Sequence, residues 1–273
     1  TDSGSGSDMS KPSSTIEIKG SDTMVNLGGA WAEAYNKMNT GTSVSVTGGG
    51  SGTGIAALIN GTTDIAESSR PMSEEEIASV KKTGNDPKEF IVAKDGVSFI
   101  VNVKNPVSKI TVDQLADIYT GKITDWKQVG GTPGKMVVMS RDRSSGTHVF
   151  VLEHVLRKGD SKGPEQYGKN VLMQLSSQSI ADEVAANQNS IGYVGMGYVD
   201  PVKHKHLFVA NDDKSKYIEP TSENILNGSY PIARPLYFYT PNDPSPEVKA
   251  FIDFVLSDEG QKLVEKEEFV PVK

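Results

Sequence analysis

The sequence predicts an α/β protein whose sheets are mainly parallel. Short strand-like runs alternate with helix-like runs along most of the chain, which is typical of parallel strands joined by crossover helices. Turns rich in Ser, Thr and Gly follow several of the expected strands, at the strand ends where open α/β sheets bind ligands. With 273 residues, 36% of them hydrophobic, the chain is long enough for one large core or for two domains.

The first third of the chain begins this alternation at residue 16. Its clearest element is a helix over 25–38, in which apolar residues such as Leu27, Trp31 and Tyr35 recur at helical spacing. Ser73 and the three glutamates after it form a helix start, because acidic residues suit the first turn. The sequence predicts strands at 16–18 and 43–47, a strand from 64 into the turn at 68–71, and helices at 25–38, 55–59 and from 73.

The rest of the chain continues the pattern. Thr111 caps a helix that Gly121 can end, and Val248, Phe251 and Val255 give a later helix its apolar face. The sequence predicts strands at 90–93, 97–103, 136–139, 191–194 and 235–240, and helices at 111–119, 149–152, 179–186 and 246–256.

Composition excludes several classes of protein. The formal charge of −7 argues against nucleic acid and anionic membranes as main partners, and the absence of cysteine excludes disulfides and thiolate metal sites. No apolar run approaches the length of a membrane span. Residues 1–14 are small and polar, so we expect a flexible leader there, either a cloning remnant or the tether of a lipoprotein whose anchoring cysteine lay upstream.

Hydroxyl-rich turns recur at the ends of the expected strands. Ser144–Thr147 follows the strand at 136–139 and the residue Arg141, and opens a helix-like run. Hydroxyls and backbone N–H groups at a helix start can bind an anion, and an arginine adds a planar fork of donors. The turns at 20–23, 48–54 and 68–70 repeat this composition, although each alone could be a helix cap or a loop. Together they predict a site for one small tetra-oxyanion.

Other chemistry is less well supported. Ser145 with His148 as a base would suggest a hydrolase, but the residues around Ser145 lack the Gly-x-Ser-x-Gly elbow. His204 and His206 are expected in a solvated loop and not at a metal. Trp31 and Trp126 are expected to pack in the core. The sequence therefore indicates no catalytic residue, no metal and no cofactor.

Several motifs resemble those of a known family, the phosphate-binding proteins of bacterial ABC phosphate importers. The resemblance runs from about residue 16 to residue 272, and the motifs that carry it are at 117–131 (DIYTGKITDWKQVGG), 141–147, 191–194 (IGYV), 230–237 (YPIARPLY) and 251–261.

This resemblance implies a two-lobed periplasmic-binding-protein fold of type II, in which two mixed, mainly parallel sheets are joined by two hinge strands. Lobe I would comprise 15–97 and 236–273, and lobe II would comprise 98–235. It also implies a monomer outside the cytoplasm that captures inorganic phosphate between the lobes and delivers it to the membrane permease. Such a protein can be lipid-anchored through a removed N-terminal segment. An anion-sensing receptor domain and a phosphate-ester hydrolase remain the alternatives, and arsenate remains an alternative ligand.

The resemblance also implies which residues bind phosphate. Matched by position, they are Thr23, the Met24 backbone N–H, Ser51, Ser69, Arg141, Ser145, Gly146 and Thr147. We add Thr53, which lies close enough to donate as well, and Asp142, the nearest carboxylate. Longer family members carry aspartates that accept the proton of bound phosphate, where this chain has Arg143 and Ser69. We expect Asp142 or the Ser69 hydroxyl to accept that proton here.

Overall fold

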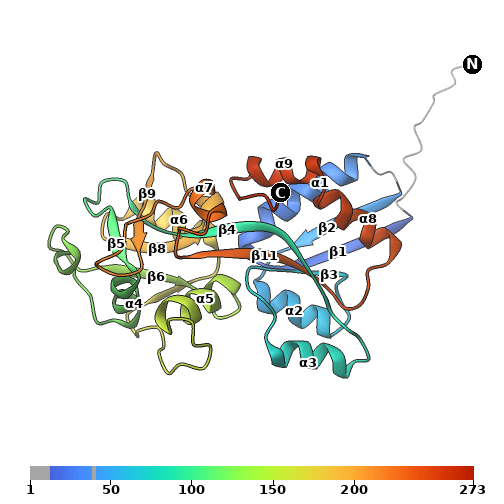
Figure 1. Cartoon of the computed structure of the whole chain (residues 1–273), viewed down its shortest axis with the longest axis horizontal. Helices are drawn as coiled ribbons and strands as arrows, with labels where there is room; N and C mark the ends of the chain where they lie inside the picture. The colour runs from blue at the N-terminus through green and yellow to red at the C-terminus, as the bar shows by residue number, and fades with distance from the viewer. Residues whose placement is uncertain (1–12, 39–40) are drawn as a thin grey trace, which may run out of the picture.

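The chain forms two groups of helices and strands that are joined by two long strands (Figure 1). The structure is a computed structural model that describes residues 13–38 and 41–273. The N-terminal strands and the C-terminal helices make up one group, called lobe I, and the middle of the chain makes up the other, called lobe II (Figure 1). The two-lobed α/β fold is therefore confirmed, while the expected leader falls almost wholly on residues 1–12, outside the described residues.

Lobe I has three parallel strands covered by helices. Its elements are β1 (Ser14–Gly20), α1 (Val25–Met38), β2 (Thr42–Thr47), α2 (Ser51–Ile59), β3 (Ile65–Ser68), α3 (Glu74–Lys82), α8 (Pro246–Val255) and α9 (Asp258–Lys266). Strand β1 pairs in parallel with both β2 and β3. The loops that follow these three strands therefore leave the sheet at one edge.

Two strands cross between the lobes. Strand β4 (Lys88–Asn102) pairs with β11 (Ala233–Thr240) up to Gly96 and with β8 of lobe II from Val97 onward. The sequence predicted two strands here, at 90–93 and 97–103, and this was wrong because the structure has one continuous strand. Asp95, between the two predicted strands, is paired with an arginine of β11 inside the continuous strand.

Lobe II holds a second sheet with its own helices. Its elements are β5 (Lys109–Thr111), α4 (Val112–Thr120), β6 (Val137–Arg141), α5 (Gly146–Val151), β7 (Leu172–Gln174), α6 (Ser177–Ala186), β8 (Ser190–Gly195), β9 (His204–His206), β10 (Phe208–Ala210) and α7 (Ser222–Leu226). Strand β6 runs parallel to β7 and β8. The sequence did not predict β5, β7, β9 and β10, which have three residues each.

Local capping signals set several helix ends. Thr111 caps α4 in a capping box, and Gly121 ends that helix in the left-handed conformation at φ +86°. Ser73 and Glu76 form the same box at α3. Helix α2 begins at Ser51, four residues before the predicted start, because its glycine-rich first turn has little helix propensity of its own.

Each lobe has its own apolar core. In lobe I, Trp31 of α1 packs edge-on against Phe238, with ring centroids 5.5 Å apart. In lobe II, Phe99 packs edge-on against both Tyr119 and Tyr193, in the same core as the buried Trp126. The packing roles predicted for both tryptophans are confirmed. Among the described helices, none is long and apolar enough to cross a membrane.

Candidate functional site

The candidate site lies where the hydroxyl-rich turns of the two lobes meet. From lobe I come the short 3₁₀ turn Asp22–Met24 after β1, the start of α2, and the turn after β3. From lobe II comes the segment between β6 and α5. The turns that the sequence singled out separately are therefore brought to one place, at the carboxyl ends of parallel strands.

Four buried hydroxyls form two contacting pairs at this junction. Thr23 Oγ1 lies 2.9 Å from Thr147 Oγ1 in the other lobe, and Ser51 Oγ lies 3.2 Å from Ser69 Oγ. The Ser69 N–H also donates to Ser51 Oγ, over 3.0 Å. Hydroxyl groups can donate or accept, so this cluster can turn its donors toward an anion without adding charge.

Gly146 allows the two lobes to approach one another. A Cβ atom added at this residue would lie 2.2 Å from Ser51 Oγ and 2.4 Å from Ser69 Oγ. Ser145 caps the helix that begins here, since its Oγ accepts from the His148 N–H over 3.3 Å. Only glycine fits where the start of α5 meets the start of α2.

The backbone also bridges the lobes next to this cluster. The Gly52 N–H donates to the Ser144 carbonyl over 3.1 Å, and Ser144 Oγ donates to the Gly49 carbonyl over the same distance. Asp142 supports this turn, because its Oδ2 accepts from the N–H and the hydroxyl of Ser144. Its Oδ1 faces Arg141 Nη2 at 3.4 Å, so both Asp142 oxygens have protein partners.

Arg141 is almost fully buried, and each of its N–H groups has a protein acceptor. The guanidinium donates to Asp22, Asp142, the Ser177 hydroxyl and the carbonyls of Gln174 and Leu175. The resemblance implied that Arg141 contacts the anion. In the structure Arg141 lies at the junction, and its N–H groups donate to protein acceptors. Its positive charge remains close to the hydroxyl cluster, although two carboxylates offset it.

Two predicted groups are bonded to partners outside the cluster. The Met24 N–H donates to the Ser21 carbonyl over 3.1 Å, inside its own 3₁₀ turn. Thr53 is exposed, and its hydroxyl donates to the Gly49 carbonyl over 3.0 Å. Arg70, at the end of the turn after β3, is held by Glu76 in a two-bond ion pair.

Arg234 and Asp95 belong to the junction, and the sequence reasoning missed both. Arg234 donates to Thr147 Oγ1 and to the Ser69 carbonyl, each over 2.9 Å, and it holds Asp95 Oδ2 with two further N–H groups. Burial raises the pKa of Asp95, and Arg234 opposes that shift. Asp95 is a carboxylate within the mainly apolar run from 90 to 103, and this feature of the sequence could have indicated its importance.

Glu67 is a second buried carboxyl that the sequence did not indicate. It lies on β3, two residues before Ser69, and neither of its carboxyl oxygens has a hydrogen-bond partner among the described residues. Burial raises the pKa of Glu67 to about 8, and the charge of Asp22 adds to the shift. Gly28 of α1 makes room for it, since a Cβ there would lie 2.6 Å from Glu67 Oε2.

The histidines do not form a catalytic or metal site in the described part of the chain. The His148 ring contacts the Arg141 carbonyl at 2.6 Å through Nδ1 and stacks on Tyr167, so it is not poised as a base for Ser145. The loop predicted for His204 and His206 was wrong, because both lie in strand β9 and His204 is buried. Within residues 13–38 and 41–273, no group of three or more potential ligands could hold a metal.

Comparison with known proteins agrees with this architecture. Residues 6–259 match the family model of the PBP superfamily domain. The chain is 36% identical over 265 residues to the phosphate-binding protein PstS of Staphylococcus saprophyticus, and the match covers 94% of this chain and 81% of that protein.

Solved structures agree as well. A protein of Clostridium perfringens described as a phosphate ABC transporter substrate-binding protein, solved with bound phosphate, superposes with a TM-score of 0.84. It is 35% identical, and the match covers 95% of this chain and all of that one. An ABC-type phosphate transport receptor from Vibrio cholerae gives a TM-score of 0.74 at 32% identity, with 93% and 99% of the two chains covered.

Proposed function

Because this chain belongs to the PBP superfamily and, within it, to the phosphate-binding proteins named PstS, we propose that it captures inorganic phosphate between its lobes and delivers it to the permease of an ABC importer. The observation that carries the proposal is the convergence of hydroxyls from both lobes at one buried junction. A buried anion needs many donors, and neutral hydroxyls supply them without a charge that must itself be desolvated.

The phosphate contacts follow from the same geometry. We propose that Thr23, Ser51, Ser69 and Thr147 donate their hydroxyls, with Ser145 and the Gly146 N–H at the start of α5. Arg141 contributes its charge from the side, and Arg234 holds Thr147 in place. Met24 and Thr53 are weaker candidates, because the N–H of one and the hydroxyl of the other have partners outside the cluster.

The acceptor for the phosphate proton is a separate question. Asp142 and the Ser69 hydroxyl remain the two candidates, and Asp142 already accepts from Ser144 and Arg141. Asp142→Asn tests the first candidate, because it replaces the carboxylate charge that repels sulfate with a neutral amide whose NH2 group can donate, and so should weaken the discrimination against sulfate. A variant that keeps its preference for phosphate over sulfate would leave Ser69 as the acceptor.

The lobe boundaries and the setting of the protein are part of the proposal. We assign 15–97 and 236–273 to lobe I and 98–235 to lobe II, which is supported by the change of partner of β4 between Gly96 and Val97. We further propose a monomer that works outside the cytoplasm at the face of the cell membrane, where a lipid can anchor it, and that has no enzymatic activity.

Isothermal titration of phosphate-free protein tests the function directly. Phosphate should bind with a stoichiometry of one, more tightly than sulfate or molybdate, at two pH values; arsenate is the closest competitor in shape and protonation. Turnover of a chromogenic phosphate ester that Ser145→Ala abolishes would instead establish the hydrolase. Small-angle scattering should also show a smaller radius with phosphate than without it.

A further inference from the structure

Asp22 connects the two lobes at the side of the candidate site. It lies in the 3₁₀ turn between β1 and α1 of lobe I, and its hydrogen bonds reach three separate elements of lobe II. Its Oδ2 accepts from Arg141 Nη1 over 3.1 Å and from the Ser177 N–H over 2.9 Å, while its carbonyl accepts from the Tyr198 hydroxyl over 2.9 Å. No match to the family implied a role for this residue.

Both partners of the Asp22 carboxylate favour its negative charge. Arg141 is a full cation, and Ser177 is the first residue of α6, a helix of 10 residues whose N-terminus carries a partial positive charge. Charge-assisted hydrogen bonds of this kind are stronger than neutral ones. The negatively charged Asp22 side chain of lobe I is therefore attracted to two positively polarised groups of lobe II.

Asp22 also sets the orientation of Arg141. Nη1 has two acceptors, Asp22 from lobe I and the Ser177 hydroxyl from lobe II, while the other acceptors of the guanidinium all belong to lobe II. When the lobes separate, Arg141 loses its one acceptor from lobe I. The direction in which the guanidinium faces the junction is therefore coupled to lobe closure.

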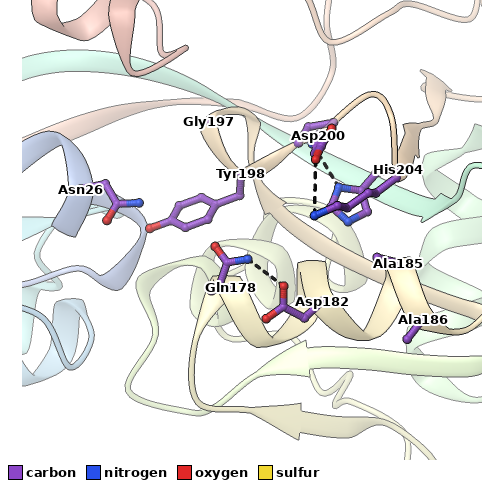
Figure 2. Close-up of a pocket in the computed structure, with 11 residues that line it drawn as sticks. Asn26, Gln178, Asp182, Ala185, Ala186, Gly197, Tyr198, Asp200 and His204 are labelled. Atoms are coloured by element: carbon purple, nitrogen blue, oxygen red, sulfur yellow. Dashed lines mark hydrogen bonds and ion pairs between the residues drawn. The ribbon is translucent and has the colours of Figure 1, made fainter.

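Tyr198 lines a groove on lobe II, and Asn26 of lobe I lies at the edge of that groove (Figure 2). In the figure, Tyr198 points from lobe II toward Asn26 on α1, with Gln178 and Asp182 of α6 below them. The groove has a volume of about 630 Å³, and the Asp22 side chain is 19% exposed. Water can therefore reach this ion pair, whereas the hydroxyls of the junction are buried.

We propose that Asp22 is a positioning residue for phosphate capture: it latches lobe II onto lobe I through Arg141 and the start of α6, and so sets how slowly bound phosphate leaves. The inference rests on the proposed function. The latch lies at the side of the anion site, so it should act on the closed form and leave the first encounter of phosphate with the open cleft unchanged.

The test is stopped-flow kinetics of phosphate binding to the whole chain, with Asp22→Asn as the variant. Asparagine keeps the shape and one acceptor but removes the charge. We expect phosphate to dissociate at least tenfold faster from Asp22→Asn, with an association rate within threefold of the wild type. The thermal midpoint of the phosphate-free variant should stay close to that of the wild type, which a purely structural role of Asp22 would not predict.

Two further variants complete the test. Tyr198→Phe removes the bond to the Asp22 carbonyl and should speed dissociation by a smaller factor than Asp22→Asn. Asp182→Asn removes the same charge from the exposed face of α6, makes no contact between the lobes, and should leave both rates unchanged. An Asp22→Asn variant that releases phosphate at the wild-type rate would overturn the latch alone, whereas a wild type that binds no phosphate would overturn the proposed function and the latch together.

Discussion

Two buried arginines lie beside the junction of the lobes, and they differ in how far their carboxylate partners are exposed to solvent. Arg141 is paired with Asp22 and Asp142, whose side chains are 19% and 23% exposed. Arg234 on β11 is paired with Asp95 on β4, which is completely buried. A pair that water can reach can separate at low cost, whereas a fully buried pair cannot, because each charge alone would be poorly solvated.

This difference assigns the two arginines different roles. The Asp22–Arg141 pair joins elements of different lobes, so lobe opening breaks it. The Asp95–Arg234 pair joins the two strands that connect the lobes, which are antiparallel neighbours. The first pair suits a contact that forms and breaks during binding, and the second suits a fixed part of the hinge.

The largest expected effect comes from breaking the hinge pair. Arg234→Met should lower the free energy of unfolding by about 3–5 kcal/mol, because it leaves the buried Asp95 carboxylate without its cation. Chemical denaturation of the phosphate-free protein measures this. Adding Asp95→Asn to that variant removes the unpaired charge and should restore part of the loss; a double variant less stable than Arg234→Met would contradict this account.

Removing the other arginine should affect binding more than folding. Arg141→Ala should weaken phosphate binding by about 2–4 kcal/mol, since Asp22 and Asp142 would lose their cation next to the bound anion. Calorimetry gives the affinity, and Arg143→Ala is the control because Arg143 is exposed and carries the same charge. If Arg141→Ala bound phosphate as the wild type does, Arg141 would have no part in the site.

Gly146→Ala should impair lobe closure and leave the folding of each lobe unchanged. The added methyl would lie 2.2 Å from Ser51 Oγ, so the lobes could close only by shifting apart, and we expect a loss in phosphate affinity of about 2–3 kcal/mol. Gly29→Ala is the matched control, because a Cβ at Gly29 meets nothing within 4 Å. Scattering with saturating phosphate should show Gly146→Ala to be more open than the wild type.

Glu67 provides a test by pH. Its pKa is raised in the folded state, so between its ordinary value and about 8 the folded chain holds a proton that the unfolded chain has lost. Stability should therefore fall as pH rises through this range, by about 1.4 kcal/mol per pH unit. Glu67→Gln should remove that component, because glutamine does not titrate. The free energy of unfolding of the variant minus that of the wild type should therefore increase from pH 6 to pH 7.5. A difference that stays constant over this range would show that Glu67 does not titrate there.

Thr53→Ala should have the smallest effect. Its hydroxyl is exposed and bonded to the Gly49 carbonyl, so we expect its removal to change phosphate affinity by less than about 0.5 kcal/mol. Ser51→Ala, two residues away and inside the cluster, should weaken binding by about 1–3 kcal/mol. Equal effects of the two changes would mean that the cluster is not where phosphate binds.

The fold class, most of the longer elements and the hydroxyl-rich turns can be predicted from the sequence alone. Helix α1 was predicted with the bounds that it has, and the caps Ser73, Thr111 and Gly121 fall where expected. These features depend on residues within a few positions of one another, so they can be read along the chain. The motifs at 117–131 and 141–147 likewise carried the family.

The pairing of the charges, in contrast, depends on contacts between distant segments. Arg141 meets Asp22 across 119 positions of sequence, and Arg234 meets Asp95 across 139. Nothing local indicates that Asp22 spans the lobes, that Glu67 is buried with no hydrogen-bond partner among the described residues, or that Thr53 faces water while Ser51 does not. These outcomes depend on which distant segments the crossing strands and the closed lobes bring together, and on how much water each segment then keeps.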